Sequence, residues 1–386
     1  MVAVAAAIAV LAITAGALAV AGALPGRPTP PTGPIQTNVP PYYVALLASQ
    51  PSPGHYSVAA RATVAAVRAT STGAEIASVS APGPYAFVSV TAAADDRTFV
   101  LLAVGPSSVK QPLNGLSYYS SYVQRFFLLH INPTALRPAA RAQLTSLPRA
   151  GIASELYVQA MALSPSGRSL AVIFTDPSRA IRANIPGQLT IFNLATGTRR
   201  TWIRTICAYG RCARGPIGLG SIVFDPGEIQ LSWTSDERSV LFLSGPEGSQ
   251  LRLLDLDAAG RELIADSSPL PVRTAYPNWT DAVITPDGKS VFIQYSTLSG
   301  NAVGRNILLR VSATTGKTAH VIQVLRNAPS SDYVLWTNND GSKFIVFRAN
   351  FFAPLGILPA GQTAGIYSGR RYAPIPWPAG VVDAAW

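Results

Sequence analysis

The sequence has few of the residues on which active sites and metal centres depend. It contains two cysteines and three histidines in 386 residues, and His55, His130 and His320 are far apart in the chain. There is no His-Glu-x-x-His helix motif and no Gly-x-Ser-x-Gly elbow. A structural zinc site needs about four ligands, and no second cysteine pair or histidine cluster is present. We therefore expect a protein that is not an enzyme, with no catalytic site, no cofactor and no metal.

Charged residues are also scarce, at 13% of the chain, and only four of them are lysines. Arginine supplies most of the positive charge, so the net charge is +11. Outside a membrane, this charge would attract anionic envelope polymers, lipid headgroups or acidic proteins. A GC-rich genome, which favours arginine and alanine, would produce the same composition without any binding role. Nucleic acid is not expected as a partner, because the sequence has no basic helix or base-stacking motif.

The N-terminus has no charged residue from Val2 to Leu24. As a helix this stretch would span about 30 Å of hydrocarbon, so residues 1–24 are predicted to be a transmembrane anchor. A cleaved signal peptide is the alternative, since Ala19-Val20-Ala21 fits a cleavage site. Residues 25–40 are rich in proline and are expected to form a linker. The remaining chain would then be extracytoplasmic, anchored to the cell membrane, or secreted if the segment is removed.

The rest of the chain repeats a short pattern, in which a tight turn is followed by an apolar strand. The turns carry Asp, Asn, Ser or Gly, and β-branched and aromatic residues follow, so each copy predicts a hairpin. A second hairpin with glycine at its turn follows each first one after a variable gap. The copies of the first pattern are AAADDRTFVLLAV from Ala92, LSPSGRSLAVIF from Leu163, WTSDERSVLFLS from Trp233, ITPDGKSVFIQY from Ile284 and TNNDGSKFIVFR from Thr337.

Two successive hairpins make a four-stranded antiparallel unit that recurs about every 50 to 70 residues, the spacing of propeller blades. Such units bury little surface alone and pack around an axis. We therefore predict an all-β fold, a six-bladed β-propeller over residues 41–386. The final GVVDAAW aligns with the inner strands before Trp233 and Trp336, and PYYVALLAS from Pro41 supplies the strand that should follow. The N- and C-terminal strands are thus expected to pair and close the ring.

The sequence resembles the TolB-type and WD40-like β-propellers. The resemblance rests on Ser164 to Gly167, Ser-Pro-Ser-Gly, and Thr285 to Gly288, Thr-Pro-Asp-Gly, which are similar to the Ser-Pro-Asp-Gly turn of that class. The other turns diverge, so the resemblance implies the fold and not a Tol-like role. The arrangement is also similar to that of membrane-anchored envelope proteins of actinobacteria, a likeness that implies little about activity.

Cys207 and Cys212 are close in the sequence, in ICAYGRCARG. In an exported protein such a pair most simply forms a disulfide across a loop. Asp236, Asp287 and Asp340 stand in the turns of the first hairpins. They are interpreted as turn-stabilising residues rather than as calcium ligands.

The connections within the hairpins are short, while those between hairpins and between repeats are long. In a propeller these two sets emerge on opposite faces, so the long loops are predicted to form a binding surface. Their arginines and tyrosines suit anionic, planar or sugar-like groups. The candidate ligand-binding residues are Tyr118, Tyr119, Tyr122, Arg179, Arg182, Arg204, Tyr209, Arg211, Arg214 and Arg305.

The leading hypothesis is a monomeric, non-enzymatic propeller that is membrane-tethered or secreted and binds a protein or anionic envelope ligand. The membrane itself is contacted through the N-terminal segment. One alternative is a propeller-type hydrolase or lyase with its active site at the channel mouth, which would need His130 or His320 beside a nucleophile and a carboxylate. Another is the ectodomain of a sensor whose cytoplasmic part lies upstream of Met1.

Overall fold

A computed structural model gives the fold and describes residues 38–48, 62–113, 117–135, 140–147, 157–175, 188–203, 205–208, 211–214, 231–244, 250–272, 279–299, 302–326, 330–350, 362–369 and 371–386. The predicted anchor, residues 1–24, and residues 25–37 of the predicted linker lie outside this part of the chain. Within these ranges there is no helix long and apolar enough to cross a membrane.

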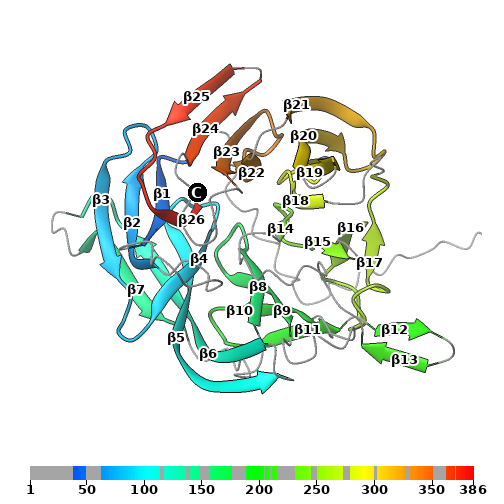
Figure 1. The fold of residues 1–386 in the computed structure, drawn as a ribbon, viewed down its shortest axis with the longest axis horizontal. Helices are drawn as coiled ribbons and strands as arrows, with labels where there is room; N and C mark the ends of the chain where they lie inside the picture. The colour runs from blue at the N-terminus through cyan, green and yellow to red at the C-terminus, as the bar shows by residue number, and fades with distance from the viewer. Residues whose placement is uncertain are drawn as a thin grey trace, which may run out of the picture. The chain divides into compact units, whose positions relative to one another are not determined.

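The described chain is built from β-strands that form one eight-stranded sheet, four four-stranded sheets and a separate two-stranded hairpin (Figure 1). The eight-stranded sheet has the order β26-β1-β2-β4-β5-β6-β7, and β3 pairs with β2 outside this order. Its strands are β1 (Tyr42–Ala48), β2 (Ala62–Ala69), β3 (Glu75–Ser80), β4 (Ala86–Ala92), β5 (Thr98–Leu113), β6 (Ser117–Ile131), β7 (Ala142–Ser146) and β26 (Val381–Ala385).

Each four-stranded sheet is an antiparallel meander of strands that are consecutive in the sequence. The first two are β8 (Tyr157–Leu163), β9 (Ser169–Thr175), β10 (Gln188–Asn193) and β11 (Arg199–Ile203), then β14 (Ser232–Trp233), β15 (Ser239–Ser244), β16 (Gln250–Asp255) and β17 (Ser267–Pro269). The others are β18 (Trp279–Ile284), β19 (Ser290–Ser299), β20 (Ala302–Ser312) and β21 (Thr318–Arg326), then β22 (Ser330–Thr337), β23 (Lys343–Asn350), β24 (Thr363–Ser368) and β25 (Arg371–Ile375). The hairpin is β12 (Thr205–Ala208) with β13 (Arg211–Arg214).

The propeller fold is confirmed, but the prediction of six blades is wrong. The described strands form four four-stranded blades, and the strands that the repeats assigned to two further blades share the eight-stranded sheet. The pair Ala62–Phe87 joins β2 to β4 and so makes one sheet of the two groups. Repeats show where hairpins form, whereas pairing between strand edges decides where one sheet ends. The fold prediction also included an N-terminal helix, and the described residues contain no α-helix.

The predicted closure of the ring is confirmed. β26 pairs antiparallel with β1, with Ala385 opposite Val44 and Asp383 opposite Leu46. Trp386 is 4% exposed, its ring stacks on Tyr43 with centroids 4.7 Å apart, and its Nε1 donates to the Thr70 hydroxyl at 3.2 Å. The last strand of the chain is therefore fixed to the first by backbone pairing and by aromatic packing.

The strands are apolar at nearly every position because successive sheets pack against both of their faces. In β9, Leu170 and Val172 lie in a core cluster shared with β4, β5 and β6, while Ala171 and Ile173 lie in one shared with β14 and β15. Similar clusters lie between the other neighbouring blades and between β1 and the β22–β25 blade. Alternate residues of one strand thus fill two interfaces, which explains the uninterrupted apolar runs in the repeats.

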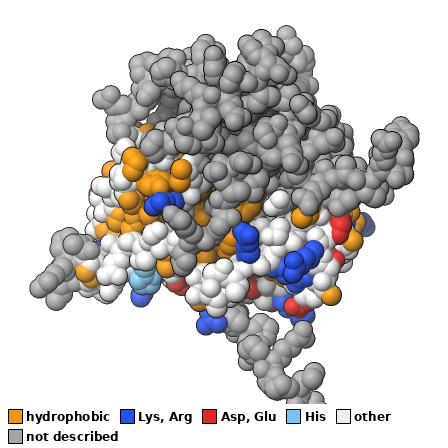
Figure 2. Space-filling model, turned by 90° about the horizontal axis from the view of Figure 1, so that it is seen from below, with side chains coloured by type: hydrophobic (Ala, Val, Ile, Leu, Met, Phe, Trp, Pro, Cys, Tyr) orange, Lys and Arg blue, Asp and Glu red, His pale blue; other side chains and the backbone are white. Residues whose placement is uncertain are grey.

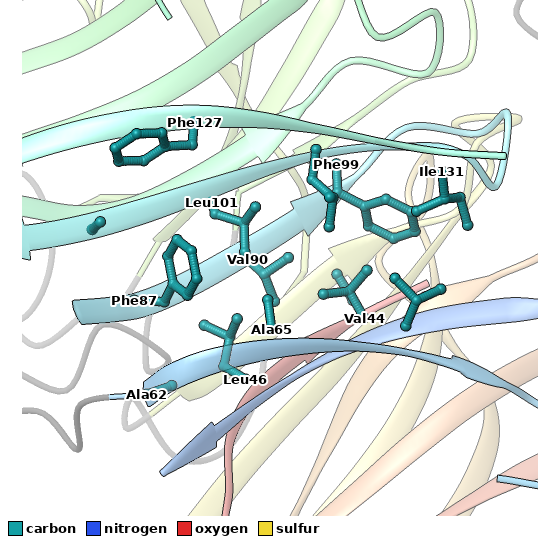
Figure 3. Close-up of a cluster of buried hydrophobic side chains, with 14 residues drawn as sticks. Val44, Leu46, Ala62, Ala65, Phe87, Val90, Phe99, Leu101, Phe127 and Ile131 are labelled. Atoms are coloured by element: carbon teal, nitrogen blue, oxygen red, sulfur yellow. The ribbon is translucent and has the colours of Figure 1, made fainter. Parts of the chain in front are cut away.

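The eight-stranded sheet also packs against itself. Figure 3 shows Val44 and Leu46, from β1, facing Phe87 and Leu101, from β4 and β5. These side chains are fully buried. The sheet therefore bends at the β2–β4 junction, and its two halves enclose a core like those between blades.

The first hairpin turns share one backbone conformation. Gly167, Gly288 and Gly341 have φ of 72°, 72° and 69°, and the residues in the same place in the other two turns, Asp96 and Glu237, have φ of 58° and 56°. Glycine adopts this left-handed conformation without the steric cost that a side chain brings. The pattern of Asp or Ser followed by Gly in the sequence thus specifies the turn. Two turns adopt the same backbone conformation with a charged residue, Asp96 or Glu237, in place of the glycine.

Candidate functional site

The propeller has two ends that differ in how the strands are joined. At one end, short turns join β4 to β5, β8 to β9, β14 to β15, β18 to β19 and β22 to β23, and we call this end the tight-turn face. Because the strands of a meander alternate in direction, the β5–β6 and β19–β20 connections lie at the opposite end, which we call the hairpin face. The ends of the strands at this face flank the long connections that the sequence predicts as a binding surface.

On the tight-turn face, the aspartates have the predicted structural role. Asp236, Asp287 and Asp340 each accept a hydrogen bond from the backbone N–H two residues later, at 3.1, 3.0 and 3.0 Å. The bond from Ser342 lowers the pKa of Asp340. Neighbouring turns are also joined, since the Asp287 N–H donates to the Asn339 carbonyl at 3.1 Å. These carboxylates accept hydrogen bonds within the turns. No group of three metal-ligating side chains occurs among the residues that the structure describes.

Several arginines donate hydrogen bonds within their own blade or to the next blade. Arg252 is 7% exposed and donates to Ser267 and to the Ile264 carbonyl. Arg200 donates to carbonyls of the next blade at Leu256, Ala258 and Gly260, and its guanidinium lies 4.3 Å from the Trp202 ring centroid. Arg310 donates to the Asp340 carbonyl of the next blade at 2.6 Å. The net charge of +11 therefore overstates the positive charge available to a ligand.

The predicted ligand-binding residues that the structure describes lie on hairpins and not in irregular loops. Tyr118, Tyr119 and Tyr122 are in β6, Arg211 and Arg214 in β13, and Arg305 in β20. The prediction that these segments are long loops is wrong. β5 and β6 pair with each other beyond their sheet, β12 and β13 form a hairpin, and β20 pairs with both β19 and β21. Outside the described residues are Arg179, Arg182, Arg204 and Tyr209.

One arginine that the sequence analysis missed lies directly opposite a predicted one. Arg305 of β20 and Arg326 of β21 are cross-strand partners. Residues directly opposite each other on antiparallel strands have Cβ atoms about 5 Å apart, and two like charges in that position destabilise the sheet. Counting outward from the turn would place Val324 opposite Arg305, but two irregularities, at Leu308/Leu309 and Arg310/Val311, shift the register by two residues. No sequence signal marks this shift.

The remaining charge at the hairpin face is also mainly positive. Among the described residues, the charged positions near this end of the strands are Lys110, Arg125, Arg211, Arg214, Arg305, Arg326, Asp281, Asp383 and the ion pair of Arg348 with Asp332. Of these, Arg125 lies 4.8 Å from the Tyr85 ring centroid. Figure 2, viewed at right angles to Figure 1, shows basic side chains dispersed over the described surface, with acidic ones beside several of them. Among the described positions near the hairpin face, positive charges thus outnumber negative ones.

The cysteines lie opposite each other in the small hairpin. Cys207 of β12 and Cys212 of β13 are cross-strand partners. Cα atoms in such pairs are about 4.5 to 5.5 Å apart, which is within the range that a disulfide requires. The register is therefore compatible with the predicted disulfide, which stays a prediction.

The histidines required by the hydrolase alternative are not brought together. His130 is in β6, opposite Thr98 and Gln143, and His320 is in β21, opposite Arg310. They lie in different sheets, and both are exposed. His55 lies outside the described residues. Nothing in the described part of the structure joins His130 or His320 to a nucleophile and a carboxylate, as that alternative requires.

No protein-family model and no curated protein matches the sequence. Solved structures do match the fold. TolB from Acinetobacter baumannii matches with a TM-score of 0.52 and 13% identity, over 91% of this chain and 67% of that chain. Kuenenia stuttgartiensis hydrazine synthase matches with a TM-score of 0.40 and 13% identity, over 75% of this chain and 65% of that one.

A further match is Porphyromonas gingivalis dipeptidyl peptidase 4, with a TM-score of 0.39 and 12% identity, over 82% of this chain and 42% of that chain. This chain therefore spans about two thirds of the first two proteins and less than half of the third. At these identities the likeness concerns the fold alone. The chain has a TolB-like β-propeller fold, as the Ser-Pro-Ser-Gly and Thr-Pro-Asp-Gly turns predict.

Proposed function

We propose that this protein is an extracytoplasmic, non-enzymatic β-propeller that binds an anionic ligand of the cell envelope on its hairpin face. The fold supports this role, because a propeller is a rigid scaffold that presents its connecting segments at one end. Two features of the described residues support it further, namely the arginine pair in β20 and β21 and the excess of positive charge near the hairpin face.

The arginine pair is the observation that carries the proposal. Arg305 and Arg326 are directly opposite each other, a placement that costs stability in the free protein. A phosphate or carboxylate bound between two guanidinium groups removes this cost and gains charge-assisted hydrogen bonds. An arrangement that destabilises the free protein and is relieved by an anion is therefore a candidate for an anion-binding site.

The location rests on features of the sequence. The uncharged N-terminal segment is long enough to enter a membrane, and Cys207 lies opposite Cys212, as in a disulfide of an exported protein. Outside the cytoplasm, anionic polymers and lipid headgroups are abundant, and a positive face attracts them. Whether the segment stays attached to the mature protein does not affect the binding site.

The test is binding of the full chain, in detergent micelles, to inorganic polyphosphate and to purified anionic cell-wall material. Arg305→Ser and Arg326→Ser are each expected to weaken binding by about tenfold, which corresponds to about 1.4 kcal/mol. Binding should also weaken as the salt concentration rises, because the attraction between exposed charges is screened.

A matched control is Lys317→Ser, which removes an exposed basic residue at the opposite end of the same hairpin. This variant should bind as the unmodified protein does. Because Arg305 and Arg326 repel each other, their removal should leave the melting temperature unchanged or raise it, so loss of binding cannot be ascribed to unfolding. Binding that is unchanged in both arginine variants would overturn the proposal.

A further inference from the structure

The β5–β6 hairpin continues far beyond the rest of its sheet (Figure 1). β4 pairs with β5 only as far as the pair Ala86–Val104, and β7 pairs with β6 only from Phe127 onward. β5 and β6 nevertheless pair with each other out to Leu113 and Ser117. We call residues 105–113 and 117–124 the arm. Among the residues that the structure describes, no strand forms a ladder with either outer edge of the arm, although the Val158 N–H of β8 donates to the Gln124 side chain at 3.1 Å.

The two edges of the arm differ in sequence. The β5 edge, GPSSVKQPL, contains Pro106, Lys110 and Pro112. Proline has no N–H to donate, and lysine on an edge opposes pairing with another strand. The β6 edge, SYYSSYVQ, has no proline, no glycine and no charged residue, and it is rich in the aromatic residues that strands favour. The sequence of one edge thus opposes pairing with a further strand, and the sequence of the other permits it.

The β6 edge is complementary to itself. The segment is a palindrome over its four central residues, because Ser120 matches Ser121 and Tyr119 matches Tyr122. Antiparallel pairing of two copies about that centre places Tyr119 opposite Tyr122, Tyr118 opposite Val123 and Ser120 opposite Ser121. Aromatic pairs, aromatic pairs with β-branched residues, and hydroxyl pairs each stabilise neighbouring strands.

The exposure of Val123 fits the same explanation. Val123 is 40% exposed, one of three large hydrophobic side chains that are exposed in the described part of the chain. In the paired arrangement it lies at the boundary between the arm and the sheet, opposite Tyr118 of the second copy. An uncharged edge strand of this length that stays unpaired is otherwise an aggregation hazard.

We propose that the β6 edge of the arm, residues 117–124, pairs antiparallel with the same segment of a second copy of this chain. The arrangement has twofold symmetry and uses the same surface on both copies, so it closes at a dimer. Growth into a longer assembly would require the β5 edges, which Pro106, Lys110 and Pro112 block. The proposal replaces the expectation of a monomer and does not depend on the anion site.

Charge placement at the centre of the pairing tests the proposal. In the variant Ser120→Lys/Ser121→Lys, each new lysine faces a lysine of the second copy, and Ser120→Glu/Ser121→Glu gives the same repulsion with the opposite sign. Each variant alone should have a dimer dissociation constant at least tenfold higher than that of the unmodified full chain, measured by sedimentation velocity in detergent micelles. A mixture of the two variants should form dimers again, because every lysine then faces a glutamate.

The mixture makes the test independent of folding, since two unfolded variants would not restore a dimer. A variant with Ser107→Lys/Ser108→Lys places the same charges on the β5 edge and should dimerise normally. Disulfide cross-linking gives a second measurement. Ser120→Cys mixed with Ser121→Cys should give a cross-linked dimer under oxidation, and neither variant alone should. An unmodified chain that is monomeric at about 100 μM, or a dimer that none of these changes affects, overturns the proposal.

Discussion

Trp386, the last residue of the chain, is predicted to carry a large part of the stability of the closed ring. It is 4% exposed, stacks on Tyr43 at 4.7 Å and on Trp377 at 5.8 Å, and donates its Nε1 to Thr70. Truncation of a buried tryptophan to alanine typically costs about 3 to 5 kcal/mol through lost contacts and the cavity left behind. We expect Trp386→Ala to lower the free energy of unfolding by this amount.

The contributions can be separated by further variants. Trp386→Phe keeps a stacking ring and loses the hydrogen bond and some volume, so it should cost clearly less than Trp386→Ala. Thr70→Val keeps the ring and leaves the buried Nε1 without its partner, at a cost of about 1 to 3 kcal/mol. Tyr372→Ala is the control, because that aromatic side chain is 47% exposed.

The measurement is urea unfolding followed by far-ultraviolet circular dichroism, which does not depend on tryptophan fluorescence. The midpoint should fall for Trp386→Ala, while the slope stays constant if both proteins unfold in one step. Should Trp386→Ala cost no more than Tyr372→Ala, the closure of the ring would not depend on this residue, and the reasoning from burial would be wrong.

Three further predictions follow from described contacts. Burial, with Asp95 beside it, raises the pKa of Asp96 to about 6 from an ordinary value of 3.8, so the folded protein binds this proton more tightly than the unfolded chain does. The stability that the protonated carboxyl contributes is therefore lost as pH rises through about 6. Asp96→Asn should stabilise the protein at pH 7 more than at pH 4, as thermal melts at the two pH values would show. Arg310→Met should lower the melting temperature more than Lys317→Met, because it removes the hydrogen bonds to Asp340 and Gly341 of the next blade. Mass spectrometry of the alkylated, non-reduced protein should show Cys207 and Cys212 unmodified, and alkylation of both without reduction would contradict the disulfide.

The repeated turns made most of the fold predictable. A turn with Asp or Gly specifies its own hydrogen bonds and backbone conformation, as Asp287 and Gly288 show, so the hairpins could be located without the structure. The final strand, which ends at Trp386, could be aligned with the strands before Trp233 and Trp336 because it carries the same sequence pattern. The number of blades could not be predicted, because the pairing of Ala62 with Phe87 joins residues of two hairpins and depends on how their edges meet in space.

The candidate site was predictable only in part. Arginine and tyrosine in the long connections indicate a binding surface, but the sequence cannot say that β5 and β6 continue as a ladder or that Arg326 faces Arg305. The arginines that clamp neighbouring blades, such as Arg200 and Arg310, cannot be distinguished by sequence from those available to a ligand.

The sequence by itself determined the hairpins and the apolar strands between them, because turn chemistry and alternating burial act over a few residues. It also determined that the final strand pairs with the first, because each inner strand carries the same pattern. Only the tertiary structure decided which edges share a sheet, which arginines face each other and which edge of the arm remains open. These features depend on register and on packing between segments far apart in the chain, where a shift of one or two residues changes every partner.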